Sequence, residues 1–189
     1  GILFEFAKTE FVLIVDARTH GRNPKVSNLI NLYRAARHAH LVIADSDIAV
    51  PPDYLRRLAG PLSDPHVGVV TCLYRGRPVD GIWSRLGAAF INEWFAPSVR
   101  VAHAGGSRRF AFGATIALRR DTLNAIGGFR ALANRLADDY WLGELTRQSG
   151  WKTVLSDGVV ETDVTETSLR ALWRHELRWL RTIRSLNAS

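Results

Sequence analysis

Methionine is absent from this 189-residue sequence, and cysteine occurs once, as Cys72. A single cysteine excludes a disulfide framework and is typical of a reducing compartment. We interpret Cys72 as a small core residue at the end of the strand VGVVTCLY. Because the chain also begins with glycine, we expect it to be a piece of a longer protein.

Long apolar runs are absent too. No run approaches the ~18 apolar residues that a membrane-spanning helix needs. Nor does the sequence contain a signal sequence, in which a charged region is followed by an apolar region and a cleavage site of small residues. The GxxxxGKS phosphate loop is missing, as are the signatures of RRM, KH and helix-turn-helix modules. These absences argue against a P-loop protein and against nucleic acid as a partner. They favour a soluble or peripheral piece, whatever its parent is.

The composition is that of one globular domain. Hydrophobic residues make up 47% of the chain and charged residues 23%, without repeats or a linker, so we expect residues 1–189 to form a single domain. The 25 Lys and Arg exceed the 18 Asp and Glu, which gives a formal net charge of +7. A basic chain favours anionic partners such as phosphates, nucleotides or acidic lipid.

Apolar strands alternate with helical patterns along the chain. This alternation predicts an α/β fold with a mixed, mostly parallel sheet. In such sheets ligands bind beyond the carboxyl ends of the strands, where Asp45 and Asp47 fall. The expected strands are 11–17, 41–47, 67–74, 110–120 and one or two within 152–162; the expected helices are 28–39, 51–62, 82–95, 121–129, 137–150 and 168–186.

The DSD motif at 45–47 places two carboxylates two positions apart, directly after a strand. Both can reach one hard cation, and Mg²⁺ or Mn²⁺ favours oxygen ligands together with substrate phosphates. The alternative is a solvated turn before a helix that starts at Pro51 and Pro52. On its own the motif is a weak signal.

A basic, amide-rich loop precedes the first predicted helix. Such a loop, leading into a helix N-terminus, can hold a phosphate or a nucleotide base. The alternative is a surface loop whose Asn and Ser residues cap the helix. Its polar members are His20, Arg22, Asn23, Lys25, Ser27 and Asn28.

The segment LADDYW places Asp138 and Asp139 at the start of a predicted helix. A carboxylate beside a bound sugar can act as general base toward an attacking hydroxyl. The competing interpretation is a helix N-cap, favoured by the helix dipole.

Residues 168–186 form a basic amphipathic pattern. Leucines, Trp173 and Ile183 share one face, Glu176 interrupts it, and residues 170–184 hold five Arg against one Glu. Arg and Trp beside an apolar stripe suit a helix at a membrane surface, and they equally suit arginines that clamp a diphosphate. An ordinary helix with a solvated basic face stays possible.

Taken together, the segments NPKVSNL, DSDI, GATIALRRDTLNAIGGF, ADDYW and HELRW resemble family 2-type membrane glycosyltransferases. The branch is similar to ceramide glucosyltransferases and hopanoid-associated glycosyltransferases, and the resemblance runs from about residue 20 to 184. It implies a GT-A-like nucleotide-diphospho-sugar transferase fold. In that family an earlier strand carries another aspartate that contacts the nucleotide base, so we expect this chain to be incomplete at its N-terminus.

The resemblance also implies roles for single residues. Asp45 and Asp47 match the aspartates that bind the metal and the diphosphate, and Asp139 matches the base for the acceptor hydroxyl. Lys25 and Asn28 match the loop near the nucleotide.

The end of the chain matches the family's (Q/R)xxRW motif. Arg178 and Trp179 match its last two residues, which close over the diphosphate. His175 stands at the first position in place of Gln or Arg, and Arg174 beside it is a candidate substitute.

The implied enzyme is an inverting, metal-dependent hexosyltransferase. It would move glucose or N-acetylglucosamine from a UDP-sugar to the hydroxyl of a ceramide- or hopanoid-like lipid. Gly113 would leave room for the acceptor near Asp138, and strand packing is the alternative for this glycine. The parent protein would be membrane-associated, with its catalytic domain on the cytoplasmic side, in a bacterial inner membrane.

Two other classes of function stay open. A nucleotidyltransferase would share the fold class and the metal-binding aspartates, but it gives no reason for the pairing of ADDY with HELRW. A non-catalytic basic module would bind anionic lipid, and its binding would survive replacement of Asp45 and Asp47 but would collapse with salt.

Overall fold

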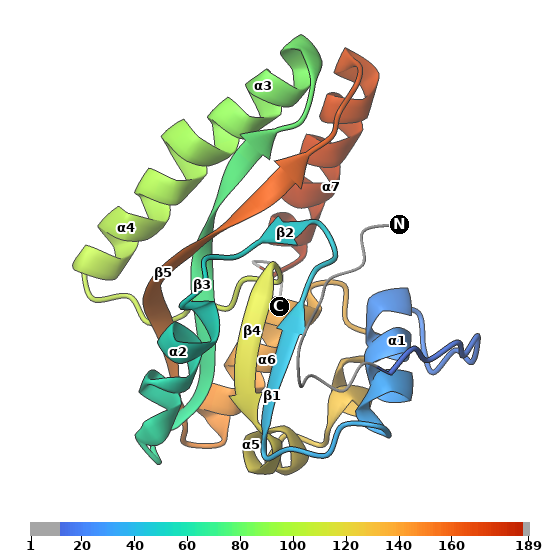
Figure 1. Cartoon of the computed structure of the whole chain (residues 1–189), viewed down its shortest axis with the longest axis vertical. Coiled ribbons are helices and arrows are strands. Elements are labelled where there is room, and N and C mark those ends of the chain that lie inside the picture. Colours follow the sequence, from blue (N-terminus) through green and yellow to red (C-terminus); the bar gives the residue numbers. More distant parts are fainter. Residues whose placement is uncertain (1–11, 187–189) are drawn as a thin grey trace.

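The computed structural model describes residues 12–186, in which five strands form one sheet in the order β1–β4–β3–β5–β2 (Figure 1). Of the four strand pairs in the described part, β3 and β5 run parallel over the longest register, and the other three are antiparallel. The mixed α/β sheet is confirmed, but its parallel share is smaller than expected. The strands are β1 His40–Ala44, β2 Ile48–Ala49, β3 Val67–Pro78, β4 Thr115–Arg119 and β5 Lys152–Val164.

Helices cover both faces of this sheet. They are α1 Pro24–Tyr33, α2 Tyr54–Ala59, α3 Gly81–Phe90, α4 Ala96–Ala104, α5 Arg120–Ala125, α6 Asp138–Gln148 and α7 Leu169–Leu186. Two 3₁₀ turns, η1 Pro61–Ser63 and η3 Phe129–Leu132, and the π-helical turn η2 Ile91–Phe95 complete the described elements.

The core lies on the two sides of β3. Val69 packs with α1, α5 and α6, whereas its neighbour Val70 packs with α2 and β5. Successive side chains of a strand point to opposite faces, so a central strand covered on both faces is buried at every position. Residues 67–74 of β3 are accordingly all buried, and Cys72 is confirmed as a core residue.

The expected buried strand 11–17 is wrong for residues 12–17, and residue 11 lies outside the described residues. Leu13 and Val15 are 76% and 89% exposed, and no described strand pairs with this segment. The backbone carbonyls of Asp16, within the segment, and of Arg18, just after it, instead accept hydrogen bonds from the side chain of Asn31. An apolar pattern alone cannot supply the pairing strand that a sheet requires.

Several expected bounds also change. The helix predicted at 28–39 begins at Pro24, because the Asn23 side chain accepts a hydrogen bond from the Val26 N–H and caps it. The strand predicted at 110–120 shortens to β4, and the single strand β5 continues to Val164. The helix predicted at 121–129 shortens to α5, Arg120–Ala125.

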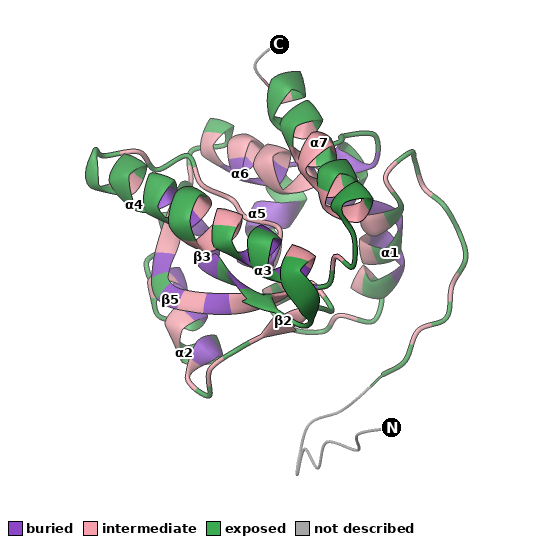
Figure 2. Ribbon diagram, turned by 90° about the horizontal axis from the view of Figure 1, so that it is seen from above, coloured by how far each residue is buried: buried purple, intermediate pink, exposed green. Residues whose placement is uncertain are grey.

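Beyond β4, strands β3 and β5 continue as a two-stranded ribbon against which α3 packs (Figure 1). Helix α7 packs on α3 at Gly87, where an added Cβ would lie 2.9 Å from Val164 and 3.2 Å from Leu172. The sides of α3, α4 and α7 that face away from the sheet are mainly exposed (Figure 2). In the part of the chain described, no helix combines the length and apolar character needed to cross a bilayer.

Candidate functional site

A cavity of about 570 Å³ gathers most of the predicted site residues from both ends of the chain. Its walls come from α1, the β1–β2 loop, β3, η2, the segments 109–114 and 136–140, and α7. The predicted residues that line it are Lys25, Asp45, Asp47, Gly113, Asp138, Asp139, His175, Arg178 and Trp179. Asn28 and Arg174 are exposed and do not line it.

Asp45 is held in place by the first helix and by the segment before β4. Its Oδ1 accepts a hydrogen bond from Lys25 Nζ at 2.6 Å, and its backbone N–H donates to the carbonyl of Ala114. The same ammonium also donates to the Gly113 carbonyl, 3.2 Å away. Lys25 therefore partly neutralises Asp45 and ties it to Gly113.

Asp47 is more open than Asp45. Its side chain is exposed, and it makes no hydrogen bond or ion pair with any of residues 12–186. No group of three or more His, Cys, Asp or Glu side chains within that range can hold a metal ion. The pair still fits a Mg²⁺ or Mn²⁺ that takes its remaining ligands from a diphosphate and water, as Mg²⁺ commonly does.

Asp139 is the buried carboxylate of the site. Its Oδ2 accepts a hydrogen bond from the Gly113 N–H and its Oδ1 from the Tyr140 N–H. Burial raises the pKa of Asp139, and the neighbouring charge of Asp138 raises it further, against the two N–H donors and Lys25. A base whose pKa moves toward neutrality is better matched to proton transfer near pH 7.

Residue 113 is a glycine because the side chains of Asp139 and Lys25 approach its backbone closely. A Cβ there would lie 3.1 Å from Asp139 Oδ2 and 3.4 Å from Lys25 Nζ. The residue precedes β4 and belongs to no strand, so packing within a strand, the alternative reading of this glycine, does not explain it.

Asp138 has a structural partner. Asn23 Nδ2 donates to its Oδ1 at 3.1 Å and to the Arg135 carbonyl at 2.9 Å. Neither aspartate is the N-cap of α6, because Ala137 occupies that position. Asp138 thus fixes the start of α6 against α1, while Asp139 faces Gly113.

Helix α7 contributes a cation and an aromatic anchor. The guanidinium of Arg178 is exposed at the cavity and makes no hydrogen bond or ion pair with the residues described. Trp179 packs edge-on to Phe95 and Tyr74, with ring centroids 5.2 and 6.5 Å apart. The tryptophan holds α7 to the core, and the adjacent arginine is left free for a ligand.

His175 also faces the cavity, held from behind by a carboxylate that sequence reasoning missed. Its Nδ1 bonds Glu166 Oε1, and the other carboxylate oxygen of Glu166 is buried without a hydrogen-bond partner among the described residues. Only 11% of the Glu166 side chain is exposed. Glu166 therefore fixes the orientation of the His175 ring.

Two further cavity residues were missed. Tyr74 lies in the buried stretch of β3, and burial raises the pKa of its phenol far above the usual range. Burial likewise raises the pKa of Glu176, with His175 opposing and Glu166 adding to the shift. The signal for Glu176 was its interruption of the apolar face of 168–186, whereas Tyr74 gave none.

An α/β domain whose aspartates and arginine meet in one cavity is consistent with the class of sugar-transferring enzymes that the motifs suggested. The match to a known family makes this specific: the profile described as "Glycosyl transferase family 21" covers residues 2–188. The chain belongs to glycosyltransferase family 21.

Curated relatives agree with this assignment. The chain is 24% identical to ceramide glucosyltransferase 3 of Caenorhabditis elegans, over 95% of its own length and 39% of the relative. It is 23% identical to ceramide glucosyltransferase 1 of the same organism, over 91% and 37%. The chain therefore spans less than half the length of these relatives.

Solved structures are more distant. Mannosyl-3-phosphoglycerate synthase from Rubrobacter xylanophilus matches with a TM-score of 0.42 at 18% identity, over 91% of this chain and 53% of that one. The crystal structure of a mycobacterial protein matches with a TM-score of 0.43 at 21% identity, over 80% of this chain and 47% of that one.

Proposed function

We propose that this chain is the catalytic part of an inverting glycosyltransferase that moves glucose or N-acetylglucosamine from a UDP-sugar to a hydroxyl of a ceramide- or hopanoid-like lipid. One observation carries the proposal. A single cavity unites the carboxylates of Asp45 and Asp47, the buried Asp139 and the free guanidinium of Arg178.

The carboxylate of Asp139 serves as the base. It would take the proton of the acceptor hydroxyl while the hydroxyl oxygen attacks the anomeric carbon from the side opposite the diphosphate. One displacement on one face inverts the configuration of that carbon. The two N–H donors from Gly113 and Tyr140 hold the carboxylate still during the attack, and fixed geometry is a large part of catalysis.

The diphosphate leaves toward the positive groups of the cavity. Arg178 supplies fixed positive charge where negative charge develops, which is the kind of stabilisation that counts most. Asp47, with Asp45 beside it, would hold a Mg²⁺ or Mn²⁺, which supplies Lewis-acid charge to the diphosphate when bound. His175 lines the same cavity from α7, where its ring, held by Glu166, would contact the diphosphate.

The rest of the cavity wall supports a lipid acceptor. It is lined by aromatic and aliphatic side chains, which would contact the acyl or terpenoid part of the acceptor close to its hydroxyl. These residues are Phe90, Ile91, Phe95, Phe110, Phe112, Leu136 and Ile183.

Exposed apolar residues next to the cavity support contact with a membrane surface, on the cytoplasmic side in the proposed parent. On α7, Leu169 and Trp173 are 57% and 63% exposed beside the arginines of the same helix. On the neighbouring α3, Ile82 and Leu86 are also exposed. Apolar and aromatic side chains flanked by arginines are typical of helices at a lipid interface.

The test is calorimetric titration of UDP, UDP-glucose and UDP-N-acetylglucosamine, with and without Mn²⁺. Asp47→Ala should abolish the metal-dependent part of UDP binding, because its carboxylate is free for the ion. Asp80→Ala is the matched control, since Asp80 is also exposed and lies outside the cavity.

Metal-dependent binding that Asp47→Ala removes and Asp80→Ala keeps would establish the donor site. UDP binding unchanged by Mn²⁺ and by Asp47→Ala would overturn the metal assignment. Transfer assays with ceramide and hopanoid acceptors then identify the lipid, and the anomeric configuration of the product tests inversion.

A further inference from the structure

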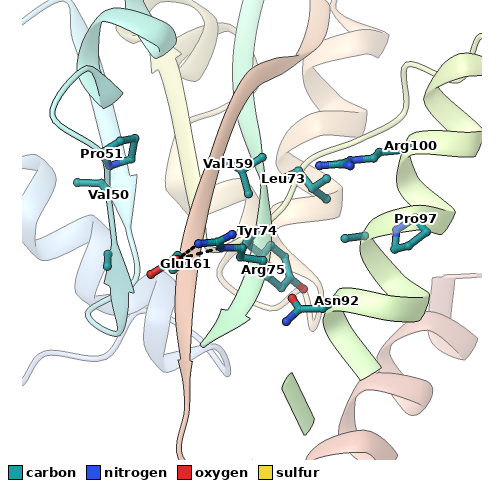
Figure 3. Close-up of a pocket in the computed structure, with 12 residues that line it drawn as sticks. Val50, Pro51, Leu73, Tyr74, Arg75, Asn92, Pro97, Arg100, Val159 and Glu161 are labelled. Atoms are coloured by element: carbon teal, nitrogen blue, oxygen red, sulfur yellow. Dashed lines mark hydrogen bonds and ion pairs between the residues drawn. The ribbon is translucent and has the colours of Figure 1, made fainter. Parts of the chain in front are cut away.

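A second cavity of about 710 Å³ lies outside the proposed donor site. Its lining shares only Tyr74 with the first cavity. Figure 3 shows Val50 and Pro51 on one side, β3 and β5 in the middle, and Asn92, Pro97 and Arg100 of η2 and α4 on the other. The volume is in the range of sites for small organic ligands.

The walls of this cavity are apolar on three sides. Leu73 and Val159 come from the two parallel strands, Ala96 and Pro97 from α4, and Val50 and Pro51 from the segment after β2. Such walls favour a ligand with a hydrocarbon portion, because a small hydrated ion would leave them in contact with water.

Charge at this cavity is unbalanced. Arg75 is held by Glu161, whose Oε1 accepts a hydrogen bond from Arg75 Nε at 2.9 Å (Figure 3). Arg100 makes no hydrogen bond or ion pair with any of residues 12–186, and its side chain points across the cavity toward Leu73 (Figure 3). The ionic lining, two arginines and one glutamate, therefore carries one net positive charge.

We propose that this cavity binds the phosphodiester of an anionic phospholipid. Arg100 pairs with the phosphate through its planar fork of N–H groups, a geometry that matches phosphate oxygens. Nη1 of Arg75, which has no partner among residues 12–186, adds a second donor, because Glu161 engages the Nε and Nη2 atoms of that guanidinium. The glycerol and first acyl carbons fill the space between Val159 and Pro97.

The surface beside the cavity suits the lipid tails. Pro97 is part of the wall, and one turn further along α4 Val101 is 73% exposed. Trp94, one turn before Pro97, is 55% exposed and stacks on Phe90, with ring centroids 4.9 Å apart. An acyl chain leaving the cavity thus meets an exposed apolar strip, which gives a lipid an advantage over free phosphate.

This inference goes beyond sugar transfer, since none of the proposed donor-binding residues lines the second cavity. The experiment titrates the chain with dihexanoyl phosphatidylglycerol below its micelle concentration, using calorimetry. Dihexanoyl phosphatidylcholine and inorganic phosphate are the comparison ligands. The variants are Arg100→Gln, Arg100→Lys and the control Arg130→Gln, an exposed arginine of η3 that lines neither cavity.

We expect phosphatidylglycerol to bind, and Arg100→Gln to weaken this binding by about tenfold or more, as the loss of a charged hydrogen-bond partner does. Arg100→Lys should retain only part of the affinity, because the charge stays but the forked pair of N–H donors is lost. Arg130→Gln should retain all of it. Asp47→Ala should also retain it, which separates this site from the donor site. Thermal unfolding of each variant checks that the fold is intact.

Four results would overturn the proposal. If phosphatidylcholine bound as tightly as phosphatidylglycerol, the net negative charge of the lipid would play no part in binding. Inorganic phosphate binding as tightly as the lipid would assign the cavity to a free anion. Lipid affinity unaffected by Arg100→Gln in a folded variant would place the lipid elsewhere, and displacement of the lipid by UDP would make this cavity part of the donor site.

Discussion

The backbone N–H of Gly113 donates a hydrogen bond to the Asp139 carboxylate over 2.9 Å, across 26 residues of sequence. The contact joins the segment before β4 to the first turn of α6. It is possible because glycine leaves space for the carboxylate, whose oxygen would lie only 3.1 Å from a Cβ. The proposed base therefore depends on the residue that faces it.

Asp139→Asn should lower the rate of sugar transfer by about 10²- to 10⁴-fold, the usual contribution of a general base. The amide keeps the shape of the side chain, and its oxygen can still accept from the Gly113 N–H. Steady-state kinetics with saturating donor measure the effect. UDP affinity should change little, because Asp139 acts on the acceptor.

Asp138→Asn is the matched control for this loss. Its side chain accepts from Asn23 Nδ2, and an asparagine oxygen can do the same. Transfer should fall by less than about tenfold. An Asp138→Asn variant as impaired as Asp139→Asn would show that the base had been assigned to the wrong aspartate.

The raised pKa of Asp139 predicts how stability depends on pH. Burial raises this pKa above the ordinary 3.8, so the folded state binds the proton more tightly than the unfolded state. The contribution of this group is therefore favourable below the ordinary pKa and is lost as pH rises through the raised one. The free energy of unfolding of Asp139→Asn, minus that of the unchanged sequence, should thus increase from pH 4 to pH 7.

Urea denaturation at several pH values measures that difference. A constant difference between the two proteins over this pH range would mean that the carboxylate titrates as an ordinary exposed group. For the same reason the acid limb of the transfer rate should lie above the ordinary carboxyl pKa of 3.8.

Gly113→Ala should impair transfer more than it impairs folding. The added methyl needs Asp139 and Lys25 to give way by a few tenths of an ångström. Displacing a catalytic group by that much lowers the rate by about tenfold, since a shift of 1 Å costs roughly 10²-fold. Gly60→Ala serves as control, because its Cβ would meet nothing closer than 3.4 Å. Equal transfer rates for Gly113→Ala and Gly60→Ala would show that the space at Gly113 does not affect the position of the Asp139 base.

The site residues that could be predicted from the sequence are polar residues at the ends of apolar strands and helices. Asp45 and Asp139 adjoin a strand end and a helix start, and such positions face ligands by topology. Tyr74 was not predictable, because an aromatic residue within a buried strand is typical of a core. Glu166 was missed because nothing local marks a carboxylate that bonds a histidine nine residues later.

The fold shows the same limit. Hydrophobic patterns found β3 as a continuous apolar run and α7 as a long repeat with helical spacing. The pattern of 12–17 satisfied the same rule but formed no strand, since pairing depends on a partner that a local window does not contain. Whether two strands run parallel or antiparallel is likewise set by the connections between them. The alternation of strands and helices in the sequence therefore predicted more parallel strand pairs than the sheet contains.

Glu166→Ala should weaken UDP binding about threefold to tenfold by freeing the His175 ring. A double-mutant cycle with His175→Ala isolates this role, because residues that act as a unit are not additive. If Glu166 acts through His175, its replacement should change nothing further once the histidine is gone. Additive losses would instead indicate a general structural role for the buried carboxylate.

Lys25→Gln should tighten the binding of Mn²⁺ in the absence of nucleotide. The Lys25 ammonium lies 2.6 Å from Asp45 Oδ1 and competes with a metal ion for that carboxylate. With the ammonium gone, Asp45 and Asp47 are both available, and affinity should rise by about tenfold, equivalent to 1.4 kcal/mol. Electron paramagnetic resonance titration of free Mn²⁺ measures this directly. Lys152→Gln is the control, since Lys152 is exposed and lines neither cavity. An unchanged affinity in Lys25→Gln would mean that Asp45 is not a ligand and that Asp47 meets the ion alone.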